Sequence, residues 1–283
     1  MEVVDSQVLI WGAATPQRPW PARAHAQRET PVSADEVIGW MDAGGVDRAV
    51  LVPPSWEGDR NDLALDAVKR YPGRFAIMGR LDPDAPHARE QMARWKGQPG
   101  MLGLRFTFHT PVLLQPLLDG RFDWVWGEAE RHGLPIMLLI HHPHMHLIDA
   151  VARAHPRLRI VIDHLGLANG EKDAHAFRDL DKLLALAERP NVAVKSSALP
   201  CYTSQPYPYP GLHAYLQRVL GAFGAKRMFW GSDQTRSPID YPAGVELFTR
   251  YMPFLHDADL GWIMGRGVCE WIGWNTNQVE EKK

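Results

Sequence analysis

The sequence has few of the features that mark secreted, disulfide-bonded or membrane-spanning proteins. Only two of its 283 residues are cysteine, Cys201 and Cys269, which is too few for a disulfide framework, and neither belongs to a metal-binding pair. No apolar run reaches the roughly 18 residues that a membrane helix needs. The N-terminus lacks a basic segment followed by an apolar core, so no secretory signal is expected. We therefore expect a cytoplasmic protein that does not insert into membranes.

The chain also lacks an excess of charge of either sign. It has 31 Lys and Arg against 33 Asp and Glu, a net charge of -2, and 45% of its residues are hydrophobic. Proteins that bind nucleic acids or acidic membranes without other help need a strong positive field. Neither is expected as a partner, and a small molecule is the natural alternative.

Proline and tryptophan are abundant, with 23 and 11 residues respectively. Prolines cluster in three segments, 15–21, 53–56 and 206–211, where they stiffen the chain. The aromatic residues of these and neighbouring loops are Trp11, Trp20, Trp56, Tyr202, Tyr207 and Tyr209. Some would pack onto the body of the protein, and the others could stack on the ring of a planar substrate. Exposed tryptophans would also suit the interface of a homodimer.

Short apolar runs alternate with segments of helical periodicity along the whole chain. The expected strands are Val3–Ile10, Arg48–Val52, Phe75–Leu81, Gly103–Phe108, Pro135–Ile140, Arg159–Asp163, Val192–Ser196 and Arg227–Gly231. Most are continuously apolar, as strands covered on both faces should be. The expected helices lie near 34–44, 61–71, 86–97, 121–133, 146–155, 174–189, 211–224 and 241–252. The first of these follows a capping box that begins at Ser33 and stops at Gly44 and Gly45.

Eight alternating strand–helix units predict an α/β protein with a single (β/α)8 barrel, a TIM barrel. The rival is a doubly wound open sheet, but the turn after the first strand is no glycine-rich phosphate cradle. No change in composition suggests a second domain, so residues 1–283 are expected to form one domain. The polar segment 275–283 is expected to fray.

Polar residues stand where these strands end, which is where (β/α)8 barrels place their chemistry. Strands one and four to eight bring to this end Gln7, Leu9, Arg105, His141, His142, Asp163, His164, Lys195, Asp233 and Arg236. Each has a structural interpretation as an ion pair, a cap or a solvated loop residue, and Asp163 is expected to brace the barrel. Barrel closure brings the set together, which favours a functional site.

The order of these motifs resembles the amidohydrolase superfamily. It is most similar to the branch of small lactonases and decarboxylases that includes 2-pyrone-4,6-dicarboxylate hydrolase. The resemblance covers most of the chain, in "VVDSQVLIW", "GVDRAVLVPPSWEGDRND", "GRFAIMGRLDP", "GLRF", "HGLPIMLLIHHP", "HPRLRIVIDHLG", "NVAVKSSA" and "FWGSDQT". It implies His141 on strand five, His164 on strand six, Asp233 as the base that activates water, and Arg105 as the group that binds a substrate carboxylate.

The first strand departs from the family pattern. Gln7 and Leu9 occupy the positions of the His-x-His pair that the superfamily uses as metal ligands. Leu has no donor atom, and the neutral amide of Gln is a poor zinc ligand. His141, His164 and Asp233 would remain as three ligands for one divalent metal, Zn²⁺ or Mn²⁺. The resemblance therefore implies a barrel whose metal site is weakened or absent.

A lactone or another activated ester can be hydrolysed without a metal. In that hypothesis Asp233 deprotonates water, and His164 polarises the carbonyl together with His141 or His142. Arg105 would bind a substrate carboxylate. The further residues that could line the substrate site are Gln7, Leu9, Trp56, Arg60, Lys195, Tyr202 and Arg236. The expected substrate is a carboxylate-bearing small molecule.

Two other functions stay open at this stage. One is the non-oxidative decarboxylation of an aromatic or unsaturated acid, which the missing first-strand histidines count against because decarboxylases of this branch rely on a metal. The other is a catalytically impaired homologue that only binds a small acid. Leu9 is the main support for that second alternative, and the retained Asp233 and His164 argue against it.

Overall fold

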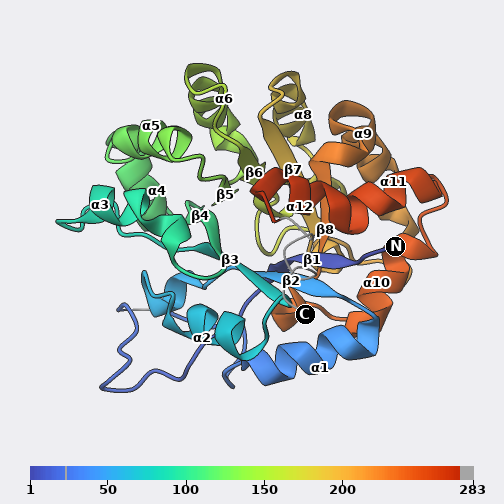
Figure 1. Ribbon diagram of the computed structural model, residues 1–283. Helices are drawn as coiled ribbons and strands as arrows, with labels where there is room; N and C mark the ends of the chain where they lie inside the picture. The colour runs from blue at the N-terminus through green and yellow to red at the C-terminus, as the bar shows by residue number, and fades with distance from the viewer. Residues whose placement is uncertain (23, 275–283) are drawn as a thin grey trace.

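In a computed structural model of the protein, which describes residues 1–22 and 24–274, eight parallel strands form one sheet in the order β1-β2-β3-β4-β5-β6-β7-β8. The strands are β1 (Val4–Val8), β2 (Arg48–Leu51), β3 (Phe75–Gly79), β4 (Met101–Thr107), β5 (Ile136–Leu139), β6 (Ile160–Ile162), β7 (Val192–Ser197) and β8 (Met228–Gly231). They lie in the middle of the molecule with helices around them (Figure 1). The predicted TIM barrel is confirmed. The C-terminal segment 275–283, which was expected to fray, lies outside the described residues.

The α-helices follow the strands in the alternation that the sequence predicts. They are α1 (Ala34–Gly44), α2 (Asp62–Arg70), α3 (Ala88–Ala93), α4 (Pro111–Leu118), α5 (Asp123–Arg131), α6 (Met145–Ala154), α7 (Asp173–Ala176), α8 (Leu180–Leu184), α9 (His213–Phe223), α10 (Tyr241–Thr249), α11 (Asp257–Gly261) and α12 (Gly267–Ile272). Within the described ranges, no helix is both long enough and apolar enough to cross a membrane.

Besides α11 and α12, which lie in a C-terminal part for which no helix was predicted, two helical regions differ from the expectation. Helix α4 was not predicted, because its proline-containing sequence reads as a loop; Thr110 caps it by accepting from the Leu113 N–H, and Pro111 occupies its first turn. The helix expected over 174–189 is divided into α7, α8 and a short 3₁₀ helix. The capping box of α1 is half formed, because Ser33 caps the Glu36 N–H while the Glu36 carboxylate pairs with Arg28.

The barrel closes where β8 meets β1. The Asp233 N–H donates to the Gln7 carbonyl at 3.0 Å, and the Ser6 hydroxyl donates to the Trp230 carbonyl at 2.6 Å. The two strands approach so closely that a Cβ atom on Gly231 would lie 2.7 Å from the Ser6 hydroxyl oxygen, so only glycine fits there. This junction sets Gln7 and Asp233 side by side at the end of the barrel that carries the candidate residues.

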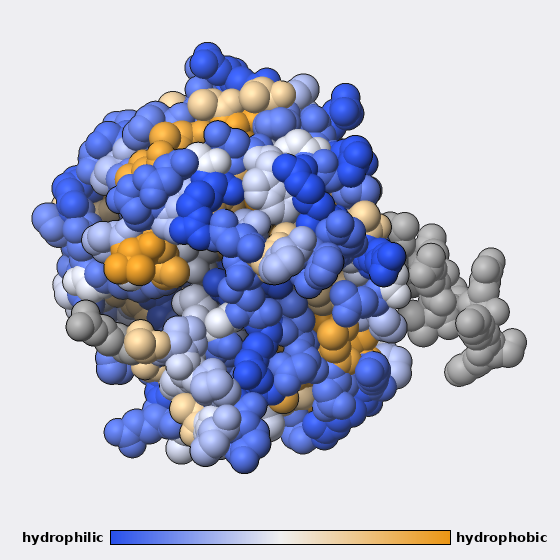
Figure 2. Space-filling view, turned by 90° about the vertical axis from the view of Figure 1, so that its left-hand side faces the viewer, coloured by the Kyte–Doolittle hydropathy of each residue, from blue (hydrophilic) through white to orange (hydrophobic). Residues whose placement is uncertain are grey.

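The surface carries no dominant apolar area on the face that Figure 2 shows. Hydrophilic side chains predominate there, and the apolar ones form small separate patches (Figure 2). Val112 and Leu118 of α4 are the most exposed aliphatic residues in the described part of the chain apart from Met1. Isolated exposed apolar residues are ordinary on soluble domains, so the homodimer stays a prediction.

Candidate active site

Three of the last strands end in residues with left-handed backbone conformation. His164 follows β6 with φ 52°, Ala198 follows β7 with φ 56°, and Asp233 follows β8 with φ 48°. Such conformations are uncommon outside glycine, cost about 1–3 kcal/mol each, and cluster at functional sites. The chain therefore turns sharply at these positions, and two of the three residues are predicted catalytic residues.

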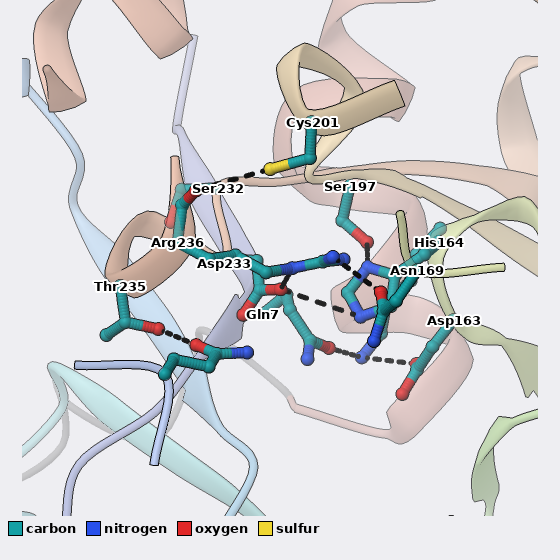
Figure 3. Close-up of polar contacts among 12 residues, drawn as sticks. Gln7, Asp163, His164, Asn169, Ser197, Cys201, Ser232, Asp233, Thr235 and Arg236 are labelled. Atoms are coloured by element: carbon teal, nitrogen blue, oxygen red, sulfur yellow. Dashed lines mark hydrogen bonds and ion pairs between the residues drawn. The ribbon is translucent and has the colours of Figure 1, made fainter. Parts of the chain in front are cut away.

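His164 stands between a hydroxyl and a carboxylate. Its Nδ1 lies 2.7 Å from the Ser197 hydroxyl oxygen, and its Nε2 lies 3.7 Å from Asp233 Oδ2 (Figure 3). Burial lowers the pKa of His164 to about 3, and the nearby Arg236 charge acts in the same direction. The imidazole is therefore neutral at pH 7. When the Ser197 hydroxyl donates to Nδ1, the single ring proton is on Nε2 and faces Asp233.

Asp233 is buried, with an exposed fraction of 1%. Burial alone would raise its pKa, but the Arg236 guanidinium and the His164 ring outweigh that effect and hold the pKa below its usual value. Arg236 Nε donates to Asp233 Oδ2. Within the described residues Oδ1 has no hydrogen-bond partner. One carboxylate oxygen is thus held by the arginine, and the other is free to accept.

Arg236 and Tyr202 contact each other in the loops at the rim of the barrel. Besides Asp233, Arg236 donates from Nη1 to Asn169 Oδ1 at 2.7 Å and from Nη2 to the Tyr202 hydroxyl at 2.9 Å. These contacts join the loops after β6, β7 and β8 (Figure 3). The Tyr202 side chain is fully buried beneath this arginine, so it packs within the loops, and its contact with a substrate stays a prediction.

A buried ionic chain lies below this layer, in the barrel interior. Lys195 Nζ donates to Gln7 Oε1 at 2.7 Å and forms an ion pair with Asp163 Oδ1 at 3.0 Å. Asp163 Oδ2 accepts from Arg105 Nε at 2.9 Å. Burial alone would raise the pKa of Asp163, but the two cations hold it far below its usual range. Asp163 braces the barrel as expected, and it positions both Lys195 and Arg105.

Two residues of the same region were not singled out from the sequence. His109 is half-buried, its Nδ1 has no partner in the described structure, and burial together with the charge on Arg105 lowers its pKa to about 4. Arg80, directly after β3, is buried and pairs with Asp59 at 3.3 Å. The signal for His109 was its spacing from Arg105, because residues two and four apart on a strand share a face.

The remaining predicted residues separate into different environments. His141 is half-buried, and its Nε2 has no partner in the described part of the chain. The ring of His142 is buried and its Nε2 lies 2.8 Å from the Leu165 carbonyl oxygen, so its role as a substrate ligand stays a prediction. Trp56 packs edge-on against Trp11, with ring centroids 5.3 Å apart, so it is partly a packing residue.

Two further candidates flank the site without polar contacts to it. Leu9 is buried in the hydrophobic core just beyond the last residue of β1. Arg60 lies half-buried in the loop that connects β2 to α2. The pocket-wall role of Leu9 and the anion contact of Arg60 both stay predictions.

The donor set does not fit a divalent metal. Among the described residues, no three His, Cys, Asp or Glu side chains lie close enough together to hold one, so His141, His164 and Asp233 are not assembled as ligands. Gln7 offers its only oxygen to Lys195. A buried ammonium 2.7 Å from that oxygen would also repel a second cation. The groups that the site offers for chemistry are therefore its own carboxylate, imidazole, amide and cationic side chains.

The charges of the region are balanced. Arg105, Lys195 and Arg236 supply three cations, and Asp163, Asp233 and Asp5 supply three carboxylates, because burial raises the pKa of Asp5 only to about 6, while His164 is neutral. In the described structure, Arg105 uses only Nε for a hydrogen bond, which leaves both Nη groups for another acceptor. The arrangement suits a ligand that carries an anionic group.

Fold and site together define a (β/α)8 barrel with a buried carboxylate and imidazole at the carboxyl ends of its strands. The chain belongs to the amidohydrolase family, whose model, Amidohydrolase, matches residues 4–266. The family resemblance of the motifs is confirmed, and the protein is a hydrolase of the amidohydrolase type.

Named relatives match over most of their length. The chain is 28% identical to an L-fucono-1,5-lactonase of Burkholderia ambifaria, over 81% of this chain and 79% of the relative. It is 27% identical to a 4-sulfomuconolactone hydrolase of Hydrogenophaga intermedia, over 82% of this chain and 74% of the relative. A probable 2-pyrone-4,6-dicarboxylic acid hydrolase from Acinetobacter baumannii, crystallised with citric acid, superposes with a TM-score of 0.77 at 18% identity. That superposition covers 96% of this chain and 100% of the other. That last likeness concerns the fold.

Proposed function

We propose that this protein hydrolyses a lactone, or a similarly activated ester, of a small molecule that bears a carboxylate. The observation that carries the proposal is the buried pair of Asp233 and neutral His164, set above the positively charged group of Arg105 and Lys195. The lactone-cleaving relatives support the same reaction class.

Asp233 is the general base in this proposal. Its free Oδ1 accepts a hydrogen bond from water and takes the proton as the water oxygen attacks the carbonyl carbon. The bond between the carbonyl carbon and the ring oxygen then breaks, and the proton passes from Asp233 to the departing oxygen, which gives a hydroxy acid. A carboxylate whose pKa is held low is a weak base, which suits an activated ester better than an amide.

His164 and Arg105 handle the other parts of the substrate. A neutral imidazole with its proton on Nε2 donates to a carbonyl oxygen without adding a buried charge. The two free Nη groups of Arg105 match a carboxylate in a two-pronged contact. His109 and His141, both with unpartnered ring nitrogens, stand as further contacts for that anion.

A substrate screen tests this function. Purified protein is incubated with a panel of sugar and muconate-type lactones and of aromatic acids, with and without EDTA, while lactone opening and CO2 release are measured. We expect lactone opening that persists after chelation. CO2 release without lactone opening would replace the proposal with the decarboxylase alternative. Binding of acids without turnover would favour the impaired homologue.

Replacing Arg236 by methionine should shift the pH dependence of the reaction. Arg236 stabilises the ionised form of Asp233, so its loss raises the pKa of that carboxyl. The base works when deprotonated, and activity should therefore disappear at a higher pH than in the wild type as the solution is acidified. The measurement is kcat/KM against pH from 4 to 9. An acid limb that stays in place would show that Asp233 is not the titrating base.

Arg250→Met is the matched control for this shift. Arg250 is exposed at the C-terminal end of α10 and pairs with Glu246 one helical turn away. Its pH profile should coincide with that of the wild type.

A further inference from the structure

The amide of Gln7 has a defined orientation. Lys195 Nζ is a hydrogen-bond donor only, and it lies 2.7 Å from Gln7 Oε1. The oxygen of the amide must therefore face Lys195, and the NH2 group must face away from it. Lys195 is itself fixed by Asp163 and has no exposed surface.

The NH2 group that results from this orientation has nothing to bind. Gln7 is 1% exposed, and within the described residues its Nε2 has no hydrogen-bond partner. Buried donors without partners are rare, and each costs about 1–3 kcal/mol. A donor that is held in place and left unpaired in the free protein indicates a ligand acceptor.

Gln7 also stands next to the proposed base. The Asp233 N–H donates to the Gln7 carbonyl, so the two residues are neighbours across the β1–β8 junction. Figure 3 shows the Gln7 side chain in the same group of polar contacts as Asp233, His164 and Asp163, with its amide oxygen joined to the ammonium that pairs with Asp163.

We propose that Gln7 Nε2 donates a hydrogen bond to the oxyanion that forms during ester hydrolysis, with Lys195 holding the amide in place. This rests on the proposed lactone hydrolysis. As the water oxygen bonds to the carbonyl carbon and Asp233 takes the proton, the carbonyl electron pair moves to oxygen and creates the charge. The electron pair on the oxyanion then re-forms the carbonyl as the bond to the ring oxygen breaks. The departing ring oxygen takes the proton from Asp233.

The environment favours such a role over simple substrate binding. The Lys195 charge lies directly behind the amide, where it polarises the N–H bonds without touching the substrate. Leu9, two residues along, is buried in the hydrophobic core. Preorganised donors in a dry site are typically worth about 10²–10³ in kcat when one is removed. Gln7 and Leu9, at the positions of a metal-ligand pair in the family, thus become a donor and an apolar wall.

Kinetics of two Gln7 variants test the inference. Gln7→Met removes the amide, and Gln7→Glu keeps its size and its acceptor for Lys195 but has no N–H. Both should lower kcat for lactone opening by about 10²–10³, with KM within about threefold of the wild type. Gln217→Met, on the exposed side of α9, is the control and should leave both constants unchanged. A rise in KM alone would overturn the oxyanion role.

Binding of phenylphosphonate provides a readout that does not depend on turnover. Its tetrahedral anionic oxygens imitate the oxyanion, and its affinity is measured by calorimetry. We expect Gln7→Met and Gln7→Glu to bind it at least tenfold more weakly than the wild type and Gln217→Met. Equal affinity, or no binding to the wild type, would overturn the inference. Lactones left intact while phosphonate binding depends on Gln7 would instead overturn the proposed reaction.

Nuclear magnetic resonance of the wild type covers the case in which the variants do not fold. With ¹⁵N-labelled glutamine, the side-chain amide of Gln7 should shift when phenylphosphonate is added, while the amide of Gln217 should not. An unchanged Gln7 signal in the presence of bound phosphonate would contradict the contact.

Discussion

Replacing Asp233 by asparagine should reduce kcat for lactone hydrolysis by about 10²–10⁴-fold. Asparagine has the shape of the carboxylate but cannot take a proton from water. The free Oδ1 is the acceptor that the wild type offers, since Oδ2 is held by Arg236. The change is measured as kcat and KM on the best lactone from the screen, with circular dichroism and thermal unfolding to confirm the fold.

Asp181→Asn is the appropriate control for this variant. Asp181 lies on α8 with an exposed side chain that pairs with Arg218 on the outside of the barrel. Its substitution should leave both kinetic constants unchanged. If Asp233→Asn turned over lactone at the rate of the wild type, Asp233 could not be the base, and the reaction would need another proton acceptor.

The barrel and most of its strand ends were predictable because they depend on local patterns. Continuous apolar runs separated by helical segments predicted eight parallel strands, and the family motifs predicted which residues follow them. His164 and Asp233 were paired correctly in this way, although no pattern in the sequence gives the 3.7 Å between them. Barrel topology alone brings the ends of β6 and β8 together.

The choice of partners could not be predicted, because it depends on contacts between distant loops. In the sequence, Arg236 looks like a solvated arginine of a rim loop. In the structure its guanidinium donates hydrogen bonds to Asp233, Asn169 and Tyr202. His142 lies next to His141 in sequence and is equally suited to a site, but its backbone turns it toward the Leu165 carbonyl. Residue type shows which side chains could bind or react with a substrate. Only the fold shows whether such a side chain already has a hydrogen-bond partner within the protein.

The first strand gives the clearest example of this difference between residue type and contact partner. From the sequence, a glutamine in place of a ligand histidine indicates only that a metal ligand is missing. In the structure the same glutamine is oriented by Lys195, a residue 188 positions away along the chain. Its meaning as a donor depends on that pairing, which no spacing within the strand could indicate.

Replacing Asp163 by asparagine should lower the free energy of unfolding by about 3–5 kcal/mol. The variant keeps the size of the side chain but leaves Lys195 and Arg105 buried without their shared counter-ion. Domains are stable by only about 5–15 kcal/mol, so the loss should be plain in urea unfolding followed by tryptophan fluorescence. Asp42→Asn, whose carboxylate pairs with Arg74 on the surface, should cost about 0–1 kcal/mol.

The pH dependence of stability separates this charge effect from a loss of packing. The pKa of Asp163 is lower in the folded protein than in the unfolded protein. In the unfolded protein it is about 4. Its contribution is therefore complete above pH 4 and is lost as the pH falls below that value toward the folded-state pKa. Asp163→Asn should lose less stability than the wild type on acidification below pH 4. If the two curves stayed parallel throughout that range, the ionised carboxylate would not be what holds Lys195 and Arg105 in the barrel.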